Sequence, residues 1–141
     1  MSHVAVLRAM ALATPKMPAL AGRPQRVLLA LDGRALSRPL LAAALKQSIR
    51  LTDRVDVLLL NPGKEPTTLL GSLLLRLEHS GIDYRLASME GNLAEEVERY
   101  LHRFQGVSVV LVGSLQPLEE ALGEKLQRLR RQGHRFIGLM S

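Results

Sequence analysis

Residues 26–51, RVLLALDGRALSRPLLAAALKQSIRL, decide the fold of this chain. The run Arg26–Leu31 is apolar without alternation, which is typical of a strand buried on both faces of a sheet. Asp32 and Gly33 end this strand, and Ser37 then offers a helix N-cap. Leucine and alanine recur after Ser37 at helical spacing, so the helix is expected to pack back onto the strand. This pattern predicts the first half of a βαβ unit.

The same alternation continues through the rest of the chain. Four further strands are predicted, each bounded by turn residues, at 54–60, 82–87, 107–112 and 135–140. Between them the spacing predicts a leucine-rich helix that ends at Gly81, a helix that begins after an Asn92 cap, and a single helix over 117–132. Five strands alternating with four helices predict one α/β domain over residues 26–141, with a parallel sheet covered by helices on both faces.

The composition excludes several classes of protein. A chain of 141 residues is long enough for one domain with a normal core. It contains no cysteine, which excludes disulfides, thiolate catalysis and cysteine-ligated metals. Its apolar runs are far shorter than the roughly 20 residues that a membrane helix needs. We therefore expect a cytoplasmic protein that does not enter a membrane.

The net charge of +6 is unevenly distributed along the chain. Residues 1–26 hold four bases and no acid, so the remainder of the chain is nearly balanced. The whole chain has only two tyrosines and two phenylalanines as aromatic residues, too few for a base-stacking surface, and we do not expect a nucleic-acid partner. Residues 1–25 are rich in proline and are predicted to form an extension that is flexible or packs on a neighbour. A targeting segment is the alternative.

The expected ligand site lies beyond the carboxyl ends of the strands, where the strand order of such a sheet reverses. The groups that the chain delivers there are Asp32 with Gly33, residues 61–64, Glu90 with Gly91, and Gly113 with Ser114. Asp32 is the strongest candidate, because it ends a central strand. Its alternative role is that of a turn residue that accepts hydrogen bonds from nearby backbone N–H groups.

No motif for catalysis or metal binding accompanies these residues. Glycine-rich dinucleotide and phosphate-loop motifs are absent, as is a His-Glu-x-x-His pair, and the four histidines lie far apart. We therefore predict no catalytic residue and no metal site. A cluster of bases near the end of the last helix complements the helix dipole, with an anion site as the alternative. It comprises Lys125, Arg128, Arg130, Arg131, His134 and Arg135.

Two stretches resemble the universal stress protein family. The first is residues 27–33, VLLALDG, followed by Ser37. The second is residues 91–96, GNLAEE, followed by VSVVLVGS at 107–114. The resemblance covers about residues 26–140. It implies a Rossmann-like fold of the adenine nucleotide alpha hydrolase type, with a five-stranded parallel sheet in the order 3-2-1-4-5, and a homodimer.

The chain departs from this family where ATP-binding members carry a glycine loop. Those members have Gly, two residues, Gly, nine residues, Gly, and then Ser or Thr. Gly113 and Ser114 match the start of this pattern, but Gln116 stands at the second glycine, and positions 126 and 127 are Leu and Gln. If the loop were shortened, Gly123 could replace the third glycine, yet Glu124 would then replace the hydroxyl. The resemblance thus indicates a divergent, non-ATP-binding member of the family.

Three functions follow from this reasoning. The first is a non-enzymatic stress-response or regulatory module that uses no cofactor, forms a homodimer and binds a protein partner. The second is an ATP- or AMP-binding protein with a degenerate glycine loop, in which Asp32, Gly33, Gly113 and Ser114 contact the ligand. The third is a response-regulator-like signalling domain. That domain needs a carboxylate cluster, and Asp32 has no acidic neighbour in the sequence.

The dimer is expected to form through the last strand. In the order 3-2-1-4-5 this strand lies at an edge of the sheet, where N–H and C=O groups lack partners. The stretch 136–140 contains no charge and no proline that would block pairing with another strand. Antiparallel pairing with a second copy would satisfy these groups, with Phe136, Ile137 and Leu139 at the interface. The alternative is that residues 1–24 cover this edge within one chain, which leaves a monomer.

Overall fold

A parallel sheet with the order β3-β2-β1-β4-β5 forms the centre of the molecule, as predicted. The computed structural model describes residues 26–63 and 68–140. The expectations for residues 1–25 and for position 64 lie outside these ranges. The strands are β1 Arg26–Asp32, β2 Arg54–Leu60, β3 Asp83–Met89, β4 Val107–Val112 and β5 Arg135–Gly138.

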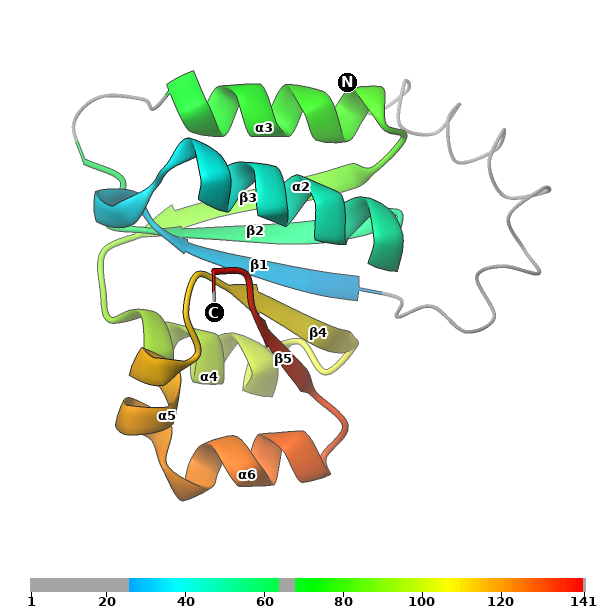
Figure 1. Cartoon of the computed structure of the whole chain (residues 1–141). Helices are drawn as coiled ribbons and strands as arrows, with labels where there is room; N and C mark the ends of the chain where they lie inside the picture. Colours follow the sequence, from blue (N-terminus) through cyan, green and yellow to red (C-terminus); the bar gives the residue numbers. More distant parts are fainter. Residues whose placement is uncertain (1–25, 64–67, 141) are drawn as a thin grey trace, which may run out of the picture.

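Helices cover both faces of the sheet (Figure 1). One layer consists of α2 Arg38–Leu51 and α3 Thr68–His79, and the opposite layer of α4 Leu93–Arg103, α5 Gln116–Leu122 and α6 Glu124–Arg131. A short 3-10 turn, η1 Gly33–Ala35, links β1 to α2. No helix in the described ranges is long and apolar enough to cross a membrane.

The core consists of two apolar clusters, one on each face of the sheet. Alternate residues of β1 point to opposite faces, so Leu29 joins one cluster and Leu28 the other. The strand residues that we predicted to be buried are at most 5% exposed, which confirms the interpretation of the unalternating runs. They are Val27, Leu29, Leu31, Val57, Leu59, Val109 and Leu111.

The predicted helix boundaries are confirmed at three places. The Ser37 hydroxyl accepts a hydrogen bond from the Leu40 N–H at 3.2 Å, and the Asn92 side chain accepts one from the Glu95 N–H at 3.1 Å. Both are N-caps that satisfy a backbone donor of the first turn. Gly81 follows α3 with a φ of +77°, a conformation that favours glycine.

The prediction of one helix over residues 117–132 is wrong. Gly123, with φ 53° and ψ −123°, separates α5 from α6, and its N–H donates to the Glu119 carbonyl at 3.0 Å. The spacing of the leucines concealed this break, because both helices bury their leucines in the same cluster. These are Leu118, Leu122, Leu126 and Leu129.

The boundaries of the two outer strands also differ from the prediction. Strand β3 runs to Met89, and β5 ends at Gly138, before the predicted end at position 140. Leu139 and Met140, the two residues after β5, form a turn beside the end of β4. Their N–H groups donate to the carbonyls of Val112, at 2.7 Å, and Gly113, at 2.9 Å.

A buried polar cluster attaches α4 to the sheet. Asp56 on β2 is 2% exposed, and its Oδ2 accepts hydrogen bonds from the Arg26 guanidinium and, at 2.6 Å, from the Tyr100 hydroxyl. Burial, together with the hydrogen bond to Asp56, raises the pKa of Tyr100 to about 12. The Phe104 ring lies 4.5 Å from the Tyr100 ring and beneath the Arg26 guanidinium. Because Asp56 is paired twice, its charge is accommodated in the interior.

Candidate functional site

The predicted site residues lie at the carboxyl ends of two adjacent strands. Asp32 and Gly33 follow β1, and Gly113 and Ser114 follow β4, which pairs with β1. The ends of β2 and β3 add Asn61 and the turn around Gly91 to the same edge. The sheet therefore brings these groups to one edge, as expected for a strand-order reversal between β1 and β4.

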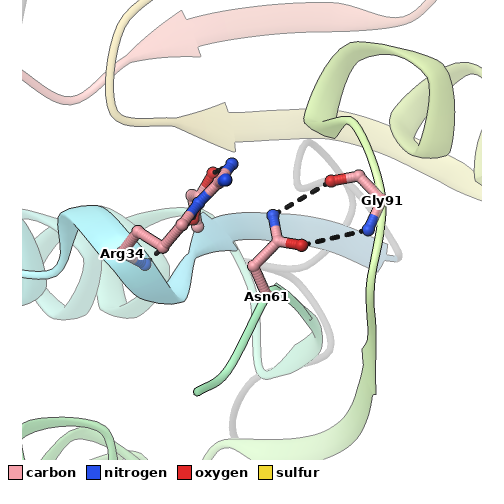
Figure 2. A network of polar contacts seen from close by, with 4 residues as sticks. Arg34, Asn61 and Gly91 are labelled. Atoms are coloured by element: carbon pink, nitrogen blue, oxygen red, sulfur yellow. Dashed lines mark hydrogen bonds and ion pairs between the residues drawn. The ribbon is translucent and has the colours of Figure 1, made fainter.

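Arg34 donates three hydrogen bonds to the Asp32 carboxylate (Figure 2). Asp32 Oδ1 accepts from the Arg34 backbone N–H at 2.9 Å and from Nε at 3.1 Å, and Oδ2 accepts from a terminal guanidinium nitrogen at 2.9 Å. The side-chain hydrogen bond from Arg34 holds the pKa of Asp32 below its ordinary value. Asp32 therefore caps the turn through backbone and side-chain contacts, which agrees with the alternative role proposed for it.

Asn61 fastens the end of β2 to the turn after β3. Its Nδ2 donates to the Gly91 carbonyl at 3.0 Å, and its Oδ1 accepts from the Gly91 N–H at 3.1 Å. Figure 2 shows this pair of hydrogen bonds beside Arg34. Asn61 has a φ of 53°, and its own N–H donates to the Met89 carbonyl at 2.7 Å. Its role was not predicted; the Asn-Pro-Gly sequence signals a turn, but nothing local indicates a partner thirty positions away.

Gly33 is needed because the chain after β2 passes directly over it. A Cβ at Gly33 would lie 2.5 Å from the Asn61 carbonyl oxygen and 2.8 Å from the Pro62 Cα, both closer than real Cβ contacts. The close approach that glycine permits here is therefore used by the protein's own backbone. At Gly113 the nearest atom to a Cβ would be a Leu40 methyl at 3.7 Å, which is an ordinary contact.

Some of the remaining groups of the expected glycine loop form hydrogen bonds within the chain. The Gly113 carbonyl accepts from the Met140 N–H, and the Ser114 hydroxyl accepts from the Gln116 N–H at 3.3 Å. Ser114 is exposed and begins the turn into α5. Gly123 lies beyond α5, and its N–H caps that helix. Glu124, which follows it, is an exposed carboxylate in the first turn of α6.

No metal-binding cluster exists among the described residues. Groups of three or more His, Asp or Glu side chains that could hold an ion are absent from residues 26–63 and 68–140. Asp32 has the Arg34 guanidinium, not a second carboxylate, as its charged neighbour. The arrangement therefore offers neither a paired-carboxylate site nor the acidic cluster that the response-regulator hypothesis requires.

The residues predicted for a dimer interface lie on and just after β5, the outermost strand beyond β4. Phe136 is 9% exposed and packs in the cluster beneath α5 and α6, with the Arg130 guanidinium 6.0 Å from its ring centroid. Ile137 and Leu139 are half-buried and pack against the opposite cluster. The edge position is thus confirmed, while the Phe136 side chain is already used within its own chain.

The basic cluster is smaller than the sequence suggested. His134 is buried, with Nδ1 2.7 Å from the Val107 carbonyl oxygen, so it is not part of a basic surface. Lys125 lies 3.8 Å from the Glu98 carboxylate, and Arg130 covers Phe136. The exposed arginines that remain lie in or near the last turn of α6, where cations complement the helix dipole.

Comparison with known proteins yields one structural similarity. No protein-family model matches this chain. No curated protein matches it in sequence either. Among solved structures, a protein from the universal stress protein family from Burkholderia pseudomallei matches with 22% identity and a TM-score of 0.48. The match covers 81% of this chain and 96% of that chain. This chain is therefore similar to a universal stress protein, and its own topology has the strand order that the sequence resemblance implied.

Proposed function

We propose that this chain is a cytoplasmic, non-enzymatic stress-response or regulatory module that forms a homodimer and binds a protein partner. The observation that carries the proposal is the closed state of the strand-end site. Arg34 pairs with Asp32, and the backbone at Asn61 and Pro62 lies over Gly33. The stress-response role is inferred from the sequence resemblance.

The closed site disfavours the alternative, ATP or AMP binding. A phosphate requires free backbone N–H groups and positive potential. The Gly123 N–H is used as a helix cap, and the carboxylate of Glu124 follows it. Arg34, a cation at this edge, forms an ion pair with Asp32, so a nucleotide that binds Arg34 would have to compete with that pair. The non-enzymatic role agrees with this arrangement, because Asp32, Asn61 and Ser114 each have a hydrogen-bond partner within the chain.

A thermal-shift assay with ATP or AMP, with and without Mg²⁺, tests this proposal. A ligand at a hundred times its Kd stabilises the native state by about 2.7 kcal/mol, or roughly 10 °C for a domain of this size. We expect no rise in Tm at millimolar nucleotide. A rise of several degrees would reject the proposal. Loss of that rise in Arg34→Ala would place the nucleotide at the strand ends, and its persistence would place it elsewhere.

The homodimer is proposed to form through the outer edge of β5. Support comes from the edge position of this strand and from the absence of charge or proline in residues 136–140. Because Phe136 packs inside its own chain, the backbone edge and the half-buried Ile137 and Leu139 would make the contact. The proposed interface thus loses the Phe136 side chain, while the antiparallel pairing about a two-fold axis is unchanged.

Analytical ultracentrifugation separates the outcomes for the dimer. We expect a dimer at tens of micromolar for the wild type and a monomer for Ile137→Lys. Leu75→Lys is the matched control, because Leu75 is 53% exposed on α3, far from β5 in the fold, and the substitution adds the same charge. A monomeric wild type would reject the dimer, and a dimer that withstands Ile137→Lys would move the interface away from β5.

A further inference from the structure

A groove of about 710 Å³ runs along the seam between α2 and α3. Its floor is apolar: Leu41, Leu45 and Ile49 come from α2, and Leu69 and Leu73 from α3. On α2 the lining extends from position 38 to position 49, which is about 16 Å of helix. A volume between about 300 and 1,000 Å³ with a mainly apolar lining is typical of a site for a small organic ligand.

The charged residues of this groove all have the same sign. Arg38, Lys46 and Arg76 line it, and among the described lining residues there is no carboxylate. The three cations are exposed, and none of them forms an ion pair with another described residue. The first turns of α2 and α3 contain no acidic side chain, whereas α4 has two there and α5 and α6 have one each. Positive potential therefore lies beside an apolar floor.

We propose that the α2–α3 groove binds a single-chain amphiphile with an anionic head, namely a long-chain fatty acid. The alkyl chain lies along the leucines, and the carboxylate is held by the cations of the groove. This assignment goes beyond the function proposed above and does not depend on it. Helices α2 and α3 cover one face of the sheet (Figure 1), and none of the groove's lining residues belongs to β5 or contacts Asp32.

The other possible occupants fit this groove less well. A helix 10 Å wide and 16 Å long has a volume of about 1,250 Å³, so roughly two fifths of it would lie outside the groove of about 710 Å³. A second copy of the chain would bring the same three cations against their equivalents, and the chain as a whole carries a net charge of +6. An alkyl chain is narrow enough to enter the seam, and a carboxylate head complements the charge.

Titration of the full chain with alkyl carboxylates below their micelle concentrations, followed by calorimetry and amide NMR, tests the proposal. We expect one dodecanoate per chain, with shift changes confined to α2 and α3. Each added pair of methylenes, from decanoate to tetradecanoate, should tighten binding about fivefold or more, because buried methylenes add to the hydrophobic free energy. Dodecyltrimethylammonium has the same chain with a cationic head and should bind at least about tenfold more weakly.

Two sets of variants locate the site without cutting into the core. Ala42 is exposed and lines the groove, so Ala42→Phe should fill it and weaken dodecanoate binding at least about tenfold. Ala121→Phe, at an exposed position of α5 on the opposite face, is the matched control and should bind normally. Arg38→Glu combined with Arg76→Glu should also abolish selectivity for the anionic head.

The matched control for the charge variant is Arg128→Glu combined with Arg131→Glu on α6, which changes the net charge equally and should keep the selectivity. Several results would overturn the proposal. They are the absence of dodecanoate binding, equal affinity for the two head groups, independence of chain length, and normal binding by a folded Ala42→Phe protein. Shift changes outside α2 and α3 would likewise place the ligand elsewhere and reject the assignment.

Discussion

Tyr100→Phe tests the buried polar cluster between α4 and the sheet. The substitution removes a 2.6 Å hydrogen bond to a carboxylate that is 2% exposed, while the aromatic ring is kept. The other oxygen of that carboxylate, Asp56 Oδ1, has no hydrogen-bond partner among the described residues, so Arg26 remains as a hydrogen-bond donor to the carboxylate. Loss of a hydrogen bond to a charged group costs about 1.5–3 kcal/mol. At about 4 °C per kcal/mol for a domain of this size, we expect Tm to fall by roughly 6–12 °C.

The same substitution changes the dependence of stability on alkaline pH. Tyr100 has a pKa of about 12 in the folded chain, against an ordinary value of 10.0. Between pH 10 and pH 12 the unfolded chain binds fewer protons than the folded chain. The stabilisation that the protonated Tyr100 contributes is therefore complete below pH 10 and is lost as pH rises through 12. Because the phenol is half-buried and partly screened by solvent, we expect this effect to be on the order of 1 kcal/mol. In Tyr100→Phe this alkaline loss should disappear.

Tyr84→Phe is the control, because Tyr84 donates a longer bond, 3.3 Å, to the Glu78 carboxylate at the half-buried edge of the sheet. We expect it to cost about 0.5 kcal/mol or less. This variant also leaves Tyr100 as the sole tyrosine, so absorbance titration reads its pKa directly. A titration midpoint near 10, or equal Tm values for Tyr100→Phe and wild type, would refute the role given to the cluster.

Substitutions at Gly33, Asn61 and Val110, with controls, test the strand ends and the core. Gly33→Ala should destabilise the fold by about 2 kcal/mol or more because its Cβ meets the Asn61 carbonyl, whereas Gly113→Ala should be nearly neutral in the same urea titration. Asn61→Ala should lower the free energy of unfolding by about 1–3 kcal/mol, because it removes both hydrogen bonds to Gly91. Asn61→Gly tolerates the positive φ and should recover only part of this loss in thermal melts. Full recovery would show that the two side-chain hydrogen bonds do not stabilise the fold. Val110→Asp should lower stability by several kcal/mol because Val110 is fully buried, and an unchanged melting curve would contradict the central position of β4.

Much of the fold was predictable because it depends on local patterns. The bounds of β2 and β4 and the burial of most of their side chains followed from mainly apolar runs without alternation, which reflect contact with helices on both faces. The caps at Ser37 and Asn92 also followed from residue type and spacing. The strand order came from the family resemblance, because periodicity does not specify which strands are neighbours.

The position of the candidate residues at the strand ends was predictable from the sequence, but the contacts that they make there were not. The sequence placed Asp32 and Gly113 at the carboxyl ends of their strands, since parallel strands bring those ends to one edge. The sequence also shows that Arg34 lies two positions after Asp32. It does not specify whether the arginine side chain points toward solvent or toward the carboxylate. Only the folded chain shows the three hydrogen bonds that hold Asp32.

The succession of strands and helices along the chain, the core residues of the strands and the departures from the glycine loop were all readable from the sequence, because each depends on residue type and short-range spacing. Tertiary structure alone decided the break at Gly123, which leaves the leucine spacing intact, and the contact of Asn61 with Gly91, thirty positions away. It also decided the α2–α3 groove, whose lining comes from two helices separated by β2. These features arise from the relative placement of distant elements, and that placement is set by packing across the sheet.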